Sequence, residues 1–166
     1  MASEVETINS ALNMIGATNI ISRTEDSKSG RVTNQRFDAV RDAVFRAHPW
    51  NCLVTRVALA ADADAPTFDW SYAFTLPTDP YCLRVMRLDY LDIDFRVEGR
   101  KILCDESTIN LVYLARVTDP NQWDALLVEA IAARLAADIS FALVQSTSLT
   151  ANMFALYESK LSEARF

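Results

Sequence analysis

Glycine is scarce in this chain of 166 residues, which contains only Gly16, Gly30 and Gly99. Phosphate loops and dinucleotide-binding fingerprints need several clustered glycines, because the backbone must approach the phosphates closely. Neither kind of nucleotide site is therefore expected, and a glycine-rich oxyanion turn is missing as well. His48 is the only histidine, and a lone histidine needs partners before it can act as a catalytic base.

The cysteines also indicate neither a metal site nor a set of disulfide bonds. Cys52, Cys82 and Cys104 are odd in number and widely spaced, without the paired spacing of a zinc site or the even count of a disulfide scaffold. They are most simply buried thiols of a protein made in a reducing cytoplasm. The acidic stretch from Asp89 to Asp94 lacks the twelve-residue pattern of a calcium loop. We expect no catalytic residue, no metal and no cofactor.

Basic residues are fewer than acidic residues. The formal net charge is −6, and the 16 lysines and arginines are scattered along the chain. Gripping DNA phosphates requires a clustered basic face, so sequence-independent DNA binding is not expected. A channel through which DNA slides without adhering is compatible with the charge. The start of the chain has no secretory leader pattern, and no apolar run reaches membrane-spanning length, so no membrane partner is expected.

Helical periodicity occupies both ends of the chain. A capping box at Ser3–Glu6 starts a helix that Gly16 ends. After a loop through residue 30, a second helix runs from about Arg31 to Ala47, and Pro49 ends it. Its expected solvent side consists of Arg36, Asp38, Arg41, Asp42 and Arg46.

The C-terminal third is expected to hold two more helices. Asp119 is the predicted N-cap of a long third helix, with Pro120 at its first position and an apolar stripe that begins at Trp123. Its many alanines allow neighbouring helices to approach closely. A last helix begins near Ser148.

Between these ends the hydrophobic period changes to two, which predicts five or six mostly antiparallel strands from Asn51 to Val117. One strand continues through residues 81–92, and a hairpin turns at Glu98-Gly99-Arg100. The predicted fold class is therefore α+β. A helical bundle built from residues 1–50 and 118–166 carries an inserted β subdomain of residues 51–117, all within one domain of residues 1–166.

Two chemical alternatives remain open beside a structural role. Cys52 and His48 lie four residues apart across a corner of the chain, which allows a cytosolic thiol enzyme. Trp70, Tyr72 and Phe74 alternate along one strand and could stack single-stranded bases. The simpler interpretation makes the tryptophans anchors of the fold and places a junction between helices and strands at these residues: His48, Pro49, Trp50, Asp119, Pro120 and Trp123.

Seven sequence motifs occur along the chain in this order: INSALNMIGA, RDAVFRAHPWN, RVALA, FDWSYAFTLPTDPYCLRV, DFRVEGRKIL, YLARVTDPNQWD and LYESKLSEA. The most specific combination is Arg41-Asp42 with Ala47-His48-Pro49-Trp50-Asn51, followed by Phe68-Asp69-Trp70 and Tyr72. Together they resemble the head-to-tail adaptor (connector) family of tailed bacteriophages, known in short-tailed phages as tail tubular protein A. The resemblance covers nearly the whole chain.

The resemblance implies a structural virion protein and not an enzyme. Such a protein is made in the host bacterial cytoplasm and forms a homo-oligomeric ring, usually a dodecamer, beneath the portal protein at the head-tail interface. It carries the tail, contacting a downstream tail tube or nozzle protein and tail fibres, while genomic DNA passes through the lumen without specific binding. We expect the partner contacts to use two sets of residues: Trp70, Tyr72 and Phe74 in the β subdomain, and Leu149, Met153, Tyr157 and Leu161 in the last helix.

Overall fold

The computed structural model describes residues 2–89 and 92–165. The chain forms two compact units, one of Met1–Cys52 with Val117–Phe166 and one of Leu53–Arg116. The first unit holds the helices from both ends of the chain, and the second holds antiparallel strands, so the predicted α+β class is confirmed. The units divide two residues after the first predicted boundary and one residue before the second.

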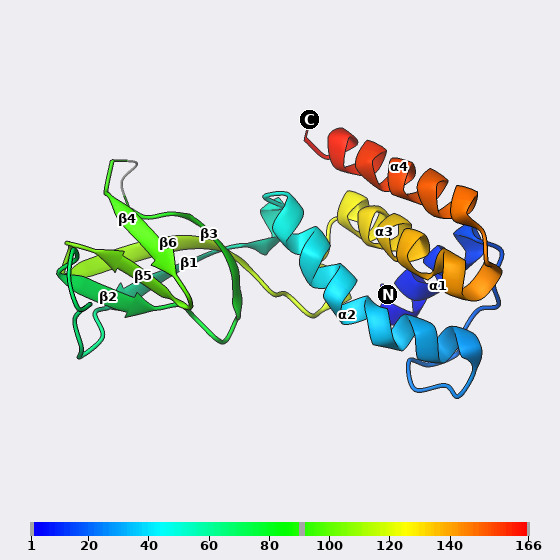
Figure 1. Cartoon of the computed structure of the whole chain (residues 1–166), viewed down its shortest axis with the longest axis horizontal. Helices are drawn as coiled ribbons and strands as arrows, with labels where there is room; N and C mark the ends of the chain where they lie inside the picture. Colours follow the sequence, from blue (N-terminus) through cyan, green and yellow to red (C-terminus); the bar gives the residue numbers. More distant parts are fainter. Residues whose placement is uncertain (1, 90–91, 166) are drawn as a thin grey trace. The chain divides into compact units, whose positions relative to one another are not determined.

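Four helices build the helical unit: α1 (Glu4–Met14), α2 (Lys28–Ala47), α3 (Ala125–Val144) and α4 (Thr147–Glu163). Helix α3 contacts each of the other three and lies between α4 and the α1–α2 side (Figure 1). Its apolar stripe is buried, as are the five alanines that surround the stripe: Ala130, Ala132, Ala133, Ala136 and Ala137. Methyl side chains let neighbouring backbones come close on several sides, so α3 is the core of this unit.

The ends of α1 follow the sequence prediction. The Ser3 hydroxyl accepts from the Glu6 backbone N–H at 3.1 Å, and the Glu6 carboxylate accepts from the Ser3 N–H at 2.9 Å. Gly16 adopts φ +71°, and the next N–H returns to the Leu12 carbonyl at 3.0 Å. This is the left-handed helix end that glycine makes without steric cost.

The start of α2 was predicted too late. The helix begins at Lys28, because the Ser27 side chain accepts from the Gly30 N–H at 3.0 Å and caps it. Its end was predicted correctly: α2 stops at Ala47, and His48 is extended, with φ −144° and ψ 144°. The proline that follows disfavours a helical conformation for His48.

The predicted start of α3 at Asp119 is wrong. Asp119 caps only a short 3-10 helix, η2 (Pro120–Gln122), and α3 begins at Ala125 with Asp124 as its N-cap. Both aspartates accept from the N–H two residues ahead, at 3.0 Å and 2.9 Å. Similarly, α4 is capped by Ser146 and not by Ser148.

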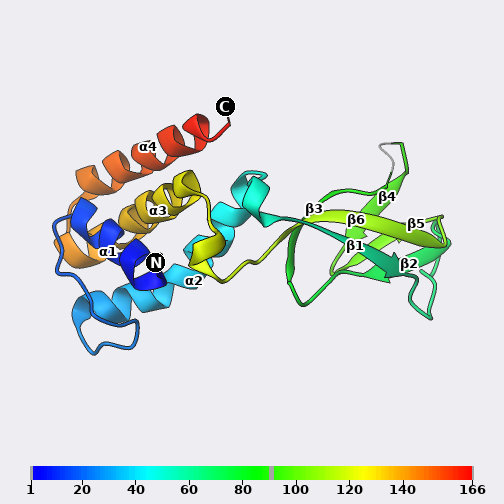
Figure 2. The same cartoon turned by 180° about the vertical axis from the view of Figure 1, so that it is seen from behind.

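The β unit contains two antiparallel sheets of three strands each, seen from both sides in Figures 1 and 2. Their orders are β1-β6-β3 and β2-β5-β4. The strands are β1 (Val54–Ala60), β2 (Tyr72–Thr75), β3 (Cys82–Arg87), β4 (Phe95–Glu98), β5 (Lys101–Cys104) and β6 (Thr108–Ala115), and a short 3-10 helix, η1 (Asn51–Leu53), precedes them.

Two details of the strands bear on the sequence predictions. β3 ends at Arg87, five residues before the predicted end of that strand, and residues 90 and 91 of the prediction lie outside the described residues. The predicted hairpin is present: β4 and β5 pair from Phe95↔Cys104 to Glu98↔Lys101, and Gly99 in the turn has φ +59°. Positive φ at this position is characteristic of the tight turns that join twisted strands.

Arg41 was predicted on the solvent side of α2, but the structure buries it. It is only 6% exposed. Its guanidinium lies 3.2 Å from Asp38 and 3.0 Å from Asp42 on its own helix, and 3.7 Å from Glu4 on α1. Arg23, in the loop between the helices, adds pairs to Glu4 at 2.7 Å and Asp38 at 3.2 Å. This network joins α1, the loop and α2, which share few other contacts.

Replacing Arg41 by alanine is expected to destabilise the protein by about 2 kcal/mol or more, because three clustered carboxylates lose their buried counter-charge. The control is Arg36→Ala. Arg36 pairs with Asp138 at 2.8 Å, but its side chain is 48% exposed, so its loss is expected to cost less than about 1 kcal/mol. Urea unfolding measures both, and equal losses would contradict the assigned role of Arg41.

Candidate functional site

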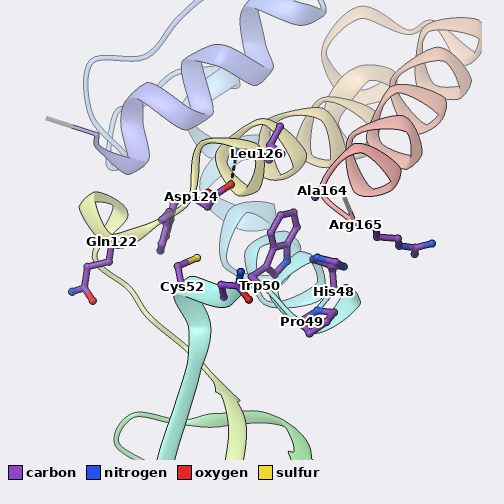
Figure 3. Close-up of a pocket in the computed structure, with 11 residues that line it drawn as sticks. His48, Pro49, Trp50, Cys52, Gln122, Asp124, Leu126, Ala164 and Arg165 are labelled. Carbon is purple, nitrogen blue, oxygen red and sulfur yellow. Dashed lines mark hydrogen bonds between the residues drawn. The ribbon is translucent and has the colours of Figure 1, made fainter.

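A cavity of about 650 Å³ lies in the helical unit, lined by the turn after α2, the start of α3 and the residues after α4. Four of the residues predicted to form a junction line it: His48, Pro49, Trp50 and Trp123. Figure 3 draws the lining residues as sticks. Asp119 and Pro120 are not among the lining residues.

Two tryptophans fix the turns beside this cavity. The Trp50 indole N–H donates to the Val44 carbonyl at 2.9 Å, and the Trp123 indole N–H donates to the Val117 carbonyl at 2.7 Å. Each bond spans six residues and closes the chain back on itself. Both tryptophans are buried, and Trp123 also packs edge-on against Phe45 with ring centroids 5.6 Å apart. A buried indole with a satisfied N–H is a typical fold anchor.

The surroundings of His48 favour its neutral form. Burial lowers the pKa of its imidazole, and the positive charge of Arg165 lowers it further, against an opposing hydrogen bond to the Ala164 backbone. The ring packs edge-on against Trp50, with centroids 4.8 Å apart and planes at 77°. This environment favours an uncharged ring that packs, not one that carries a proton.

The surroundings of Cys52 do not favour a nucleophilic thiol. Burial raises the pKa of its thiol, partly offset by a hydrogen bond from the Asp124 backbone. A nucleophilic cysteine needs a lowered pKa and a nearby cation or base. In Figure 3 the Cys52 and His48 side chains lie on opposite sides of Trp50. The geometry therefore gives the thiol-enzyme alternative no support.

The predicted aromatic set does not form one surface. Phe74 is fully buried in the core of the β unit, whereas Tyr72 is 36% exposed. Trp70 is half-buried and precedes β2, which begins at Tyr72. The alternating pattern predicts that the three side chains share one face of a strand. One single-stranded nucleic acid cannot stack its bases on both a buried core residue and a surface residue. Phe74 is therefore removed from the candidate contact residues.

The expected contact stripe of the last helix is also revised. Tyr157 and Leu161 are buried, and Leu149 and Met153 are half-buried. The stripe packs on α3, because α4 makes its main contacts with that helix. The sequence pattern identified the apolar side of α4 correctly but assigned it to a partner protein, whereas it completes the helical unit itself.

Among the described residues of the helical unit, the exposed aromatic side chains are Phe141, at 59%, and Phe154, at 43%. The Arg134 guanidinium lies 5.4 Å from the Phe154 ring centroid and 5.3 Å from that of Tyr157. It also pairs with Asp138, which in turn pairs with Arg36. Both phenylalanines lie outside the apolar stripes of their helices. An aromatic residue at a helical position outside the stripe was the sequence signal that could have identified them.

Among residues 2–89 and 92–165, no three His, Cys, Asp or Glu side chains are grouped so that they could hold a metal ion. None of the helices in this described part of the chain combines the length and apolar character that a bilayer crossing requires. Comparison of the chain with models of known protein families and with curated proteins found no match.

Cys52 is expected to react with iodoacetamide at pH 7 more slowly than a free cysteine, because its raised pKa leaves less thiolate. Peptide mass spectrometry over a time course measures the rate, with the urea-unfolded protein as reference. His48→Asn should leave the rate unchanged. Fast labelling that depends on His48 would restore the thiol-enzyme hypothesis.

Proposed function

We propose that this protein is a head-to-tail adaptor of a tailed bacteriophage, a structural virion protein and not an enzyme. In this role, copies of the chain form a ring beneath the portal protein, join the capsid to the tail and surround the passage of the genome. The ring is a dodecamer in the resembling family. The proposal draws on the motifs shared with that family and on the surface of the two units.

The observation that carries the proposal is the set of large apolar side chains left at the surface. Among the described residues seven are exposed, three in the helical unit and four in the β unit: Ile21, Phe141 and Phe154, and Val54, Phe68, Tyr72 and Val97. A ring subunit must contact neighbours on two flanks as well as partners above and below. Apolar residues on both units fit a protein with several contact surfaces.

The charge supports a passive lumen. Acidic residues outnumber basic ones by 22 to 16, so the ring would carry a large negative charge when the subunit is repeated. Like charges repel, and DNA phosphates would pass such a wall without adhering to it. The same repetition strengthens docking, because many weak contacts made at once give a nearly irreversible attachment.

Two exposed aromatic residues support the choice of a portal-facing surface in this proposal. Phe141 and Phe154 are aromatic and exposed, and Arg134 stacks beside Phe154. Aromatic residues and arginine are enriched at the energetically dominant positions of protein interfaces. We therefore assign portal docking to Phe141 and Phe154 and withdraw Tyr157 and Leu161, which are buried against α3.

The direct test is to mix the purified chain with the portal protein of the same virus at physiological salt and measure co-sedimentation. We expect a stable complex and, in mature virions, a ring of this chain at the head-tail interface by cryo-electron microscopy. Absence of the chain from mature virions would refute the proposal.

Phe154→Asp is expected to weaken portal binding at least about tenfold, because it removes an exposed aromatic anchor and adds a charge. Asn152→Asp adds the same charge at an exposed position of α4 without removing an aromatic ring, and it should bind like the parent protein. Circular dichroism checks that both variants stay folded. Equal binding by the two variants would remove Phe154 from the interface.

A further inference from the structure

A hollow of about 530 Å³ lies on the β1-β6-β3 sheet of the β unit. Two arginines line it, Arg56 from β1 and Arg87 from β3, with Val112 of β6 between them. Ala58, Asp89 and Asn110 line it as well. It is separate in the sequence from every residue considered above for catalysis or portal docking.

The strand register explains why the two arginines share one hollow. Val112 pairs with Arg56 on one side and with Arg87 on the other. Residues directly opposite each other in antiparallel strands point to the same face of the sheet. Neighbouring strands lie about 4.8 Å apart, so the two backbone positions are separated by about 10 Å. Two long guanidinium side chains can converge on one anionic group across that span.

Among the described residues, neither arginine of the hollow is held in an ion pair. Asp89 is the only carboxylate that lines it, and both of its oxygens accept from Asn110, one from the backbone N–H and the other from the side-chain amide at 3.2 Å. Arg87 donates to the Leu88 carbonyl at 3.1 Å. In the part of the chain that the structure describes, no carboxylate lies within ion-pair distance of Arg56 or Arg87.

Two other cations of the β unit, Lys101 and Arg100, are engaged differently. Lys101 pairs with Asp62 at 2.8 Å. Arg100 donates to the carbonyls of Cys82 and Pro77 and lies over the Tyr81 ring, 4.0 Å from its centroid. Arg56 and Arg87 are distinguished by their shared position in one hollow, and two guanidiniums that lie close together are suited to binding one carboxylate.

We propose that this hollow binds an acidic side chain of a short peptide segment from a partner protein. Its carboxylate would sit between Arg56 and Arg87, and its apolar neighbours would contact Val112 and Ala58. A nucleic acid fits less well, because the chain as a whole carries −6 and repels an extended polyanion. A single carboxylate experiences mainly the charges that line the hollow, which are two guanidiniums and the one carboxylate of Asp89. This site goes beyond the adaptor role and does not depend on ring formation.

The probe is a capped eight-residue peptide of alternating valine and glutamate, titrated into the isotope-labelled full chain and followed by backbone amide NMR. We expect saturable shifts at β1, β6 and β3. The variants Arg56→Gln and Arg87→Gln should each weaken binding at least about tenfold, the loss expected for one charge-assisted hydrogen bond. Arg96→Gln is the matched control, because Arg96 is exposed on β4 of the other sheet and does not line the hollow.

Three comparisons make the result decisive. A valine–lysine peptide of the same length should not bind, and neither oligothymidine nor inorganic phosphate should bind more tightly than the acidic peptide. The proposal is overturned by no binding of the acidic peptide at millimolar concentration, by equal binding of the lysine peptide, by preferential binding of oligothymidine or phosphate, or by equal losses in all three arginine variants. The amide spectra of the variants also report whether the β unit stays folded.

Discussion

Burial of α3 on several sides is the constraint on which the helical unit depends. The segments before and after the β unit are far apart in the sequence, and they share one core only because α1, α2 and α4 all pack on this helix. Its alanines make the close approach possible, and its buried Ile131 and Leu135 supply apolar area. A larger side chain at the alanine positions would push the neighbouring helices apart, which well-packed cores tolerate poorly.

The sequence predicted the class and order of elements because period and capping are local signals. It failed where two local signals competed. Asp119 and Asp124 both offer a side-chain cap, and Pro120 favours the first of them. The structure uses both, and α3 starts at the second, because the Trp123 indole bonds to the Val117 carbonyl and closes a turn between the two caps. That hydrogen bond depends on burial of Trp123 in the folded protein, which cannot be predicted from the neighbouring residues in the sequence.

The candidate sites show the same limit. Apolar periodicity marked Phe74, Tyr157 and Leu161 correctly as apolar-face residues, but it does not say whether the covering surface belongs to the same chain or to another one. Arg41 was placed on the solvent side of its helix, yet it is buried and three carboxylates from two helices surround it. The hollow between Arg56 and Arg87 depends on a register between strands that lie far apart in the chain. Pairing of that kind cannot be predicted from the alternation within either strand.

The first and last strands of the β unit are direct partners, with Val54 opposite Leu114. The points at which the chain enters and leaves this unit are therefore neighbours within it, a few ångströms apart across one ladder. Residues 53–116 can therefore be exchanged as one segment by recombination. A replacement sequence whose two ends meet at the same spacing would leave the core of the helical unit unchanged.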